Sequence, residues 1–258
     1  MRIRLLLKFR VIPLYFMGGL LLFALGILGT ALAQEKPASK IASTERIAKL
    51  DLTKYSEDAA KWDQDVTKLS AGNTTQGGPE TILCMGSSSF RLWDSISDDM
   101  APFSVVRRAY GGAKFCDLAI HAPKLIEGLR FRAAMIFVAN DIVGKEKDKS
   151  PEEVARLAKI VIDAVRKENP TAPVFLIAIT PCPSRFPSWP TIAMANQSLE
   201  KLCTPESKTY FVATESKYMD AKGVPIPELF VKDMLHQNKD GYAIWSGLLK
   251  EALKKNLP

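Results

Sequence analysis

Short apolar runs recur along most of the chain, and segments with helical periodicity separate them. The runs lie at 81–85, 104–106, 133–139, 173–180 and 208–213. Runs of this length, bounded by polar or glycine-rich segments, are typical of buried strands. Strands that alternate with helices indicate a parallel sheet with helices on both faces. The pattern therefore predicts an α/β fold, a three-layer α/β/α sandwich around a five-stranded parallel sheet of flavodoxin-like type.

The clearest predicted helix begins after Ser150, which has the features of an N-cap. Pro151 suits the first helical position, Glu153 is placed to complete a capping box, and Pro170 ends the segment. An earlier segment over 55–69 has a single apolar stripe, which predicts one helix on the outside of the domain. A last helix is expected over 242–253.

The first 33 residues have a different pattern, a basic segment followed by an apolar one. Basic residues at positions 2, 4, 8 and 10 precede an apolar stretch that ends in Ala31-Leu32-Ala33. This order is typical of a secretory signal, although a stretch of this length could also remain as a membrane anchor. We therefore predict a signal peptide or N-terminal membrane anchor at 1–33, a flexible linker at 34–54 and one domain at 55–258. The protein is then periplasmic or secreted, or anchored by the N-terminal segment.

Charge and cysteine usage exclude two classes of partner. Without the four basic residues of the signal, the net charge falls from +7 to +3, and no basic stripe with aromatics remains, so we expect no nucleic-acid partner. The cysteine spacings match no zinc motif, and His121 and His236 are the only histidines, so we expect no metal and no cofactor. Cys182 and Cys203 are the better candidates for a disulfide, whereas Cys84 and Cys116 are predicted to be buried thiols.

Residues of the types that take part in catalysis or ligand binding follow four of the five predicted strands. Ser88 follows the first, Gly112 the second, Asn140 the third, and Asp233 with His236 the fifth. Right-handed crossovers bring these ends to one edge of the sheet, where ligands bind. Taken singly, each has an ordinary explanation as a cap, a turn or a surface residue.

Together these groups meet the requirements of acyl transfer. Ser88 would be the nucleophile, His236 its base, and Asp233 the group that orients the ring. The N–H groups of Ser88 and Gly112 and the amide of Asn140 are the donor types that an oxyanion needs. Glycine at position 112 would let the main chain approach the substrate without a Cβ.

The blocks that carry these residues resemble those of the SGNH (GDSL-type) hydrolase superfamily. The matching blocks are "GSS" over 86–88, "AYGGAKF" over 109–115, "VANDI" over 138–142 and "KDMLH" over 232–236. "GSSSFRLW", "TPCPSRFPSWPTIAMAN" and "HQNKDGYAIW" further resemble the branch near platelet-activating-factor acetylhydrolases and bacterial acetylesterases. The resemblance covers about 62–253. It implies that Ser88 is the nucleophile, with Ser87 and Ser89 as turn and helix-cap residues, and that His121 is structural.

The chain departs from the family pattern at four places. Ser87 replaces a common aspartate, and Val138 replaces a glycine and should crowd the turn before Asn140. Arg107-Arg108-Ala109 stands where Asn-Arg-Gly is frequent, and Ala113 replaces a common polar residue. None of these changes removes a catalytic role, but they leave the substrate open.

The resemblance implies a serine esterase that cleaves short-chain esters, acetyl esters above all, with carbohydrate esters as one substrate class. The alternative is a catalytically weak or inactive glycan-binding module of the cell envelope. A phosphate or flavin site is disfavoured, because no Walker lysine follows the serines and the Asp-x-x-His pair would have no role.

Overall fold

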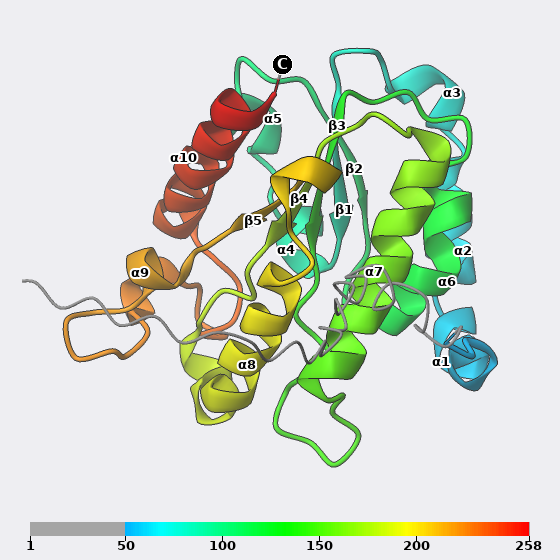
Figure 1. Ribbon diagram of the computed structural model, residues 1–258. Coiled ribbons are helices and arrows are strands. Elements are labelled where there is room, and N and C mark those ends of the chain that lie inside the picture. The colour runs from blue at the N-terminus through cyan, green and yellow to red at the C-terminus, as the bar shows by residue number, and fades with distance from the viewer. Residues whose placement is uncertain (1–49, 258) are drawn as a thin grey trace, which may run out of the picture. The chain divides into compact units, whose positions relative to one another are not determined.

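The computed structural model describes residues 50–257, so the predicted segment 1–33 and most of the predicted linker lie outside the described residues. Five strands form one parallel sheet (Figure 1). They are β1 (Ile82–Gly86), β2 (Val105–Ala109), β3 (Ala133–Phe137), β4 (Val174–Ile177) and β5 (Thr209–Val212). Their order across the sheet is β2-β1-β3-β4-β5, which is the flavodoxin-like order. The predicted fold class is confirmed.

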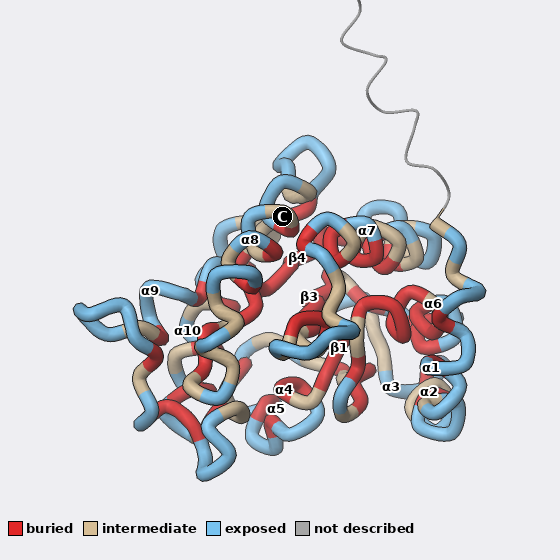
Figure 2. The backbone as a smooth tube through the Cα atoms, turned by 90° about the horizontal axis from the view of Figure 1, so that it is seen from below, coloured by how far each residue is buried: buried red, intermediate tan, exposed pale blue. Residues whose placement is uncertain are grey.

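Helices cover both faces of this sheet. The α-helices are α1 (Ser56–Ala60), α2 (Asp63–Ser70), α3 (Asn73–Gln76), α4 (Ser88–Arg91), α5 (Ile96–Asp99), α6 (Phe115–Ile126), α7 (Pro151–Glu168), α8 (Trp189–Glu200), α9 (Glu215–Tyr218) and α10 (Lys239–Asn256). Short 3-10 helices are η1 (Thr53–Tyr55), η2 (Pro183–Ser188), η3 (Pro205–Ser207) and η4 (Pro227–Leu229). Helices α6 and α7 lie on one face and α10 with α5 on the other, and the buried residues concentrate between them (Figure 2).

Each strand contributes side chains to two separate apolar clusters. In β1, Leu83 and Met85 join the cluster formed with α6 and α7. Ile82 and Cys84 join the cluster formed with α10. Successive side chains of a strand point to opposite faces, so burial of both faces requires an unbroken apolar run. This is why the sequence pattern of the strand shows no alternation of apolar and polar residues.

The amphipathic segment before the sheet forms two helices rather than the single predicted one. A turn at Lys61 and Trp62 separates α1 from α2, and both helices pack against α6. Trp62 Nε1 donates a hydrogen bond of 3.1 Å to Asp117 Oδ2 on α6. Leu50 and Leu52, at the end of the predicted linker, also pack against the cluster on this face.

Helix α7 begins and ends as predicted, except that its capping box is incomplete. Ser150 Oγ accepts the N–H of Glu153 at 3.1 Å, and Pro151 is the first helical residue. The Glu153 carboxylate accepts instead from Lys54 Nζ at 3.2 Å and from the hydroxyl of Tyr55. A charged partner and a hydroxyl offer a carboxylate stronger hydrogen bonds than one backbone amide. Glu153 therefore fastens η1 to α7.

All four cysteines are free thiols, so the candidate pair Cys182–Cys203 is not formed. Cys84 and Cys116 are buried, as predicted. Burial raises the pKa of each to about 12, which keeps both thiols neutral.

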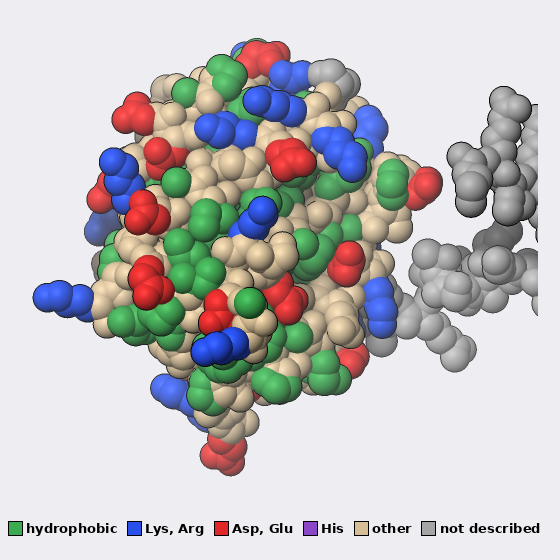
Figure 3. Space-filling model, turned by 90° about the vertical axis from the view of Figure 1, so that its left-hand side faces the viewer, with side chains coloured by type: hydrophobic (Ala, Val, Ile, Leu, Met, Phe, Trp, Pro, Cys, Tyr) green, Lys and Arg blue, Asp and Glu red, His purple; other side chains and the backbone are tan. Residues whose placement is uncertain are grey.

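The surface shows no single dominant charge on the face drawn in Figure 3, where Lys and Arg side chains alternate with Asp and Glu. Within residues 50–257 no helix combines the length and the apolar character needed to cross a bilayer. The same residues contain no group of three or more His, Cys, Asp and Glu side chains arranged to hold a metal ion.

Candidate active site

The turn after β1 depends on Gly86, whose φ is +144°. A Cβ on this residue would lie 1.9 Å from the carbonyl oxygen of Phe137 on β3. The close approach of the two chain segments lets the N–H of Ser87 donate a hydrogen bond of 3.0 Å to the same oxygen. Helix α4 then begins at Ser88. The strand, the turn and the helix together present Ser88 at the carboxyl edge of the sheet.

The serines on either side of Ser88 act through their main chains. Ser87 is the N-cap residue of α4, but its hydroxyl makes no capping hydrogen bond. Its carbonyl accepts the N–H of Phe90 at 3.2 Å. The carbonyl of Ser89 accepts the hydroxyl of Tyr242 on α10 at 2.8 Å. Ser87 therefore occupies the predicted cap position, although without side-chain capping, and Ser89 lies in the first turn of α4.

Arg107, one of the departures from the family pattern, fixes the other end of α4. Its Nη1 donates to the carbonyls of Phe90, Arg91 and Trp93 at 3.1–3.4 Å. The last carbonyls of a helix have no partner within the helix, so a guanidinium there replaces water.

The Asp-x-x-His segment forms a closed loop after α9 and η4. Asp233 Oδ1 accepts the N–H groups of Leu235 and His236, both at 2.9 Å. The N–H of Val231 donates to the carbonyl of His236 at 2.9 Å, and Met234 takes a φ of +57° at the tip. These contacts turn the His236 ring back over the carboxylate, so that Nδ1 lies 2.6 Å from Asp233 Oδ2.

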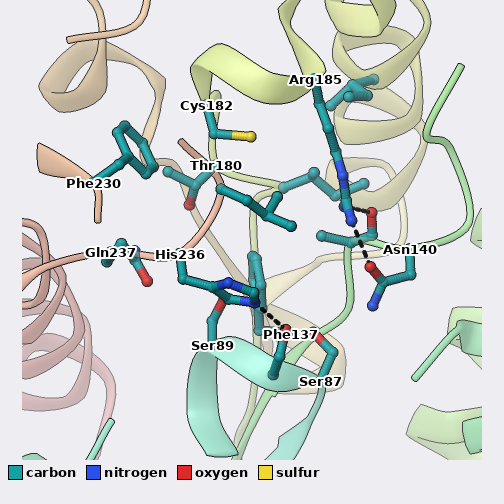
Figure 4. A pocket seen from close by; sticks show the side chains of 15 residues that line it. Ser87, Ser89, Phe137, Asn140, Thr180, Cys182, Arg185, Phe230, His236 and Gln237 are labelled. Carbon is teal, nitrogen blue, oxygen red and sulfur yellow. Dashed lines mark hydrogen bonds between the residues drawn. The ribbon is translucent and has the colours of Figure 1, made fainter. Parts of the chain in front are cut away.

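Ser88, His236 and Asp233 form one hydrogen-bonded chain, and Figure 4 draws the His236 ring with its dashed hydrogen bond. His236 Nε2 lies 2.8 Å from Ser88 Oγ. A carboxylate only accepts, so Nδ1 carries the ring proton and Nε2 is left to accept from the serine hydroxyl. Burial tends to raise the pKa of Asp233, but the backbone and ring hydrogen bonds from His236 and the amide of Leu235 outweigh it and lower that pKa. An ionised carboxylate therefore faces the ring.

Asn140 follows β3 and faces the same cavity. Its Nδ2 donates to the carbonyl of Ala113 at 2.8 Å, and its Oδ1 accepts from Arg185 Nη2 at 2.6 Å. An amide nitrogen carries two hydrogens, so one remains for a ligand.

Gly112 lies in the turn after β2 and is not among the residues that line the cavity. Its φ is +75°, and an added Cβ would meet only the Trp62 ring, at 3.4 Å. The positive φ gives a backbone reason for glycine here, since few other residues adopt it, and the avoidance of a clash with substrate stays a prediction.

A small cavity lies between the serine, the histidine and the asparagine. It is lined by Ser87, Ser88, Ser89, Phe137, Ala139, Asn140, Ile179, Thr180, Cys182, Arg185, Ile192, Phe230, Leu235, His236 and Gln237. Its volume is about 30 Å³, and one water molecule needs about 10–15 Å³. The cavity therefore has room for a group of a few heavy atoms.

Sequence reasoning assigned no site residue to the fourth strand, and the structure places Arg185 there. Arg185 lies on η2, which follows the loop after β4, and it lines the cavity. The only signal in the sequence was its position after a strand, within a segment already matched to the related branch.

Two other residues have structural roles. His121 is buried in α6, and its Nε2 lies 2.9 Å from the carbonyl of Ala59, as expected of a structural histidine. Val138 is buried in the cluster between the sheet and α6 and α7. Its side chain therefore packs in the core, and the crowding of the turn before Asn140 stays a prediction.

Asp141, next to Asn140, is a buried acid. Its Oδ2 accepts the N–H of Phe115 at the start of α6, at 2.8 Å. Its Oδ1 has no hydrogen-bond partner and lies 3.7 Å from Lys149 Nζ. Burial raises the pKa of Asp141 to about 6, against the opposing effects of the Phe115 amide and Lys149.

The raised pKa gives Asp141 a defined effect on stability. The folded state holds its proton up to about pH 6, whereas the unfolded chain releases it near 3.8. The contribution of Asp141 to the free energy of unfolding is therefore greatest below pH 3.8 and falls as the pH rises to about 6. We expect the free energy of unfolding of wild type, relative to Asp141→Asn, to decrease across this window in urea titrations. A difference that stays constant or increases with pH would contradict the assignment.

Solved structures with similar folds include proteins named as a lipase and as a carbohydrate esterase. A Streptococcus pneumonia protein provisionally named a platelet activating factor is 21% identical, with a TM-score of 0.67, over 77% of this chain and 95% of that one. A GDSL-like lipase from Bacteroides thetaiotaomicron is 15% identical, with a TM-score of 0.57, over 80% and 98%. A carbohydrate esterase family 3 protein from Talaromyces cellulolyticus is 15% identical, with a TM-score of 0.52, over 68% and 96%.

No family profile matches the chain, and no curated protein matches its sequence. At the identities of the solved structures, the likeness establishes the fold, which is SGNH-like. The sequence resemblance to SGNH and GDSL-type hydrolases is confirmed at that level.

Proposed function

We propose that this protein is a serine ester hydrolase of the SGNH type, which works through an acyl-enzyme. The observation that carries the proposal is the hydrogen-bonded chain from Ser88 Oγ through His236 to Asp233, with links of 2.8 and 2.6 Å. A serine hydroxyl becomes a useful nucleophile only when a base accepts its proton, and the unprotonated Nε2 of His236 is within reach to do so.

In the proposed mechanism, His236 takes the proton of Ser88 as Oγ attacks the ester carbonyl carbon. Asp233 holds the ring in the required tautomer and stabilises the imidazolium that forms. His236 then protonates the leaving alcohol as the carbon–oxygen bond breaks. A water molecule repeats the sequence on the acyl-enzyme, which releases the acid and restores Ser88.

The negative charge of the tetrahedral intermediate needs hydrogen-bond donors. The N–H of Ser88 opens α4, where the first amides have no partner within the helix. The second hydrogen of Asn140 Nδ2 supplies a side-chain donor beside the cavity. The N–H of Gly112, in the adjoining turn, is the third proposed donor. Donors fixed before the reaction stabilise the oxyanion without reorganisation.

We propose short acyl groups, acetyl above all, as the part of the substrate that enters the cavity. The support is its volume of about 30 Å³ and the apolar residues in its lining, which include Ile179, Ile192 and Phe230. An acetyl esterase, 15% identical with a TM-score of 0.52, and the family 3 carbohydrate esterase are among the similar structures. They favour acetylated carbohydrate as the alcohol part, which would leave through the open side of the site.

A panel of p-nitrophenyl esters tests both parts of the proposal. The purified domain should cleave the acetate, and kcat/KM should fall at least about tenfold from acetate to octanoate, because extra methylenes do not fit the cavity. An organophosphonate should label Ser88 alone, as peptide mass mapping would show. Turnover no greater than that of Ser88→Ala would favour a glycan-binding module instead. Faster cleavage of octanoate would contradict the short-chain proposal.

We further propose that the protein is exported and acts outside the cytoplasm. The support is the basic and apolar pattern of 1–33 with its Ala31-Leu32-Ala33 site. N-terminal sequencing of the mature protein should begin at Gln34. A chain that keeps Met1 and sediments with membranes would instead identify an anchor.

A further inference from the structure

Arg185 contacts the end of β3 with both terminal nitrogens of its guanidinium group (Figure 4). Nη2 donates to Asn140 Oδ1 at 2.6 Å, and Nη1 donates to the carbonyl oxygen of Ala139. The two acceptors belong to consecutive residues, so the planar fork of the guanidinium fixes a side chain and its own backbone together. Figure 4 shows the arginine reaching across the cavity from η2 toward Asn140.

The two partners of Asn140 determine which way its amide faces. Arg185 can only donate, and the carbonyl of Ala113 can only accept. In the opposite orientation, the amide nitrogen would face the guanidinium and the amide oxygen would face the carbonyl, and both hydrogen bonds would be lost. Asn140 therefore has a single favourable orientation, in which Nδ2 keeps one hydrogen for a ligand.

The charge of Arg185 is not neutralised by a direct partner. No ion pair within residues 50–257 includes it, and both of its acceptors are neutral oxygens. The charges of Asp148 and Asp141 act on it without forming an ion pair, and a half-buried cation of this kind is stabilised further when negative charge develops nearby. The oxyanion of the proposed reaction is such a charge, and a cation on Oδ1 also polarises the amide so that Nδ2–H becomes a stronger donor.

We infer that Arg185 is a positioning residue that orients and polarises the Asn140 amide as an oxyanion donor. The inference rests on the proposed ester hydrolysis. It assigns a role to the end of the fourth strand, and it accounts for an arginine at a place where it forms no ion pair. Arg185 acts through Asn140 and does not itself bind the oxyanion.

The test is a double-mutant cycle with p-nitrophenyl acetate. Asn140→Ala should lower kcat by about 10²–10³-fold, as loss of one oxyanion donor does. Arg185→Met should lower kcat by about tenfold or more with little change in KM, since the loss falls on the transition state. In the Asn140→Ala background, Arg185→Met should lower kcat hardly any further. Arg185→Lys should recover part of the loss, because an ammonium still reaches one of the two acceptors.

Arg166→Met is the matched control. Arg166 also donates from its guanidinium to backbone carbonyls, those of Ser207 and Lys208, but these precede β5 at the opposite edge of the sheet. The kcat of Arg166→Met should equal that of wild type. Wild-type kcat in Arg185→Met, or an equal loss with and without Asn140, would overturn the inference. Absence of Ser88-dependent turnover in wild type would instead refute the proposed function.

A spectroscopic readout tests the positioning without turnover. The side-chain amide signal of Asn140 in a ¹H–¹⁵N spectrum is identified by its disappearance in Asn140→Ala. It should shift or broaden in Arg185→Met and stay in place in Arg166→Met. An unchanged Asn140 signal in Arg185→Met would overturn the inference whatever the kinetics show.

Discussion

Ser88→Ala and His236→Ala should each lower kcat for an acetyl ester by about 10⁶-fold, and the double variant should lose no more than either single variant. The structure gives the reason, since the two side chains meet in one hydrogen bond of 2.8 Å and the attack needs both. Removing the serine leaves the base without a proton to accept. Removing the base leaves the hydroxyl protonated, and a neutral hydroxyl attacks an ester too slowly to matter.

The measurement is single-substrate kinetics on purified variants, with circular dichroism as a check on folding. Ser246→Ala is the matched control, because the Ser246 hydroxyl donates only to the carbonyl of Ala243 within α10. It should keep full activity. A loss of the same size in Ser87→Ala or Ser89→Ala would place the nucleophile elsewhere in the cluster. Losses that multiply in the double variant would show that Ser88 and His236 act independently.

Gly86→Ala should lower the free energy of unfolding by about 3–5 kcal/mol, the combined size of a severe steric contact and a strained backbone. The added Cβ would lie 1.9 Å from the carbonyl oxygen of Phe137, which is backbone and cannot rotate away. The φ of +144° adds a conformational cost for any residue other than glycine. Relief would require β1 to separate from β3, which would also displace Ser88 from His236.

Gly247→Ala is the matched control for this substitution. Gly247 lies exposed in α10, where an added Cβ meets nothing within 4 Å. Alanine in a helix interior is favoured over glycine, so this variant should gain about 0.5–1 kcal/mol. Urea denaturation measures both. If Gly86→Ala proved as stable as wild type, the close approach between β1 and β3 would not exist as described.

The local pattern of apolar runs placed every strand, but it extended β3 and β4 too far and missed the extent of β2. The apolar run predicted 104–106, whereas the strand continues through Arg107 and Arg108 to Ala109. Arg108 is buried because its guanidinium donates to Asn73 Oδ1 and Gln76 Oε1 on α3. A charged residue can occupy a strand interior only where such partners exist, and the local sequence contains no sign of them.

The sequence by itself determined the five strands, the long helices α7 and α10, and the edge at which Ser88, Asn140, Asp233 and His236 gather. Apolar runs, caps and strand ends are local properties, and a parallel sheet brings its strand ends together. The tertiary structure alone left Cys182 and Cys203 as free thiols. It also decided that Arg185 pairs with Asn140 and Glu153 with Tyr55. These contacts join residues distant in the chain. Their choice depends on distances and burial that exist only after the helices have packed on the sheet.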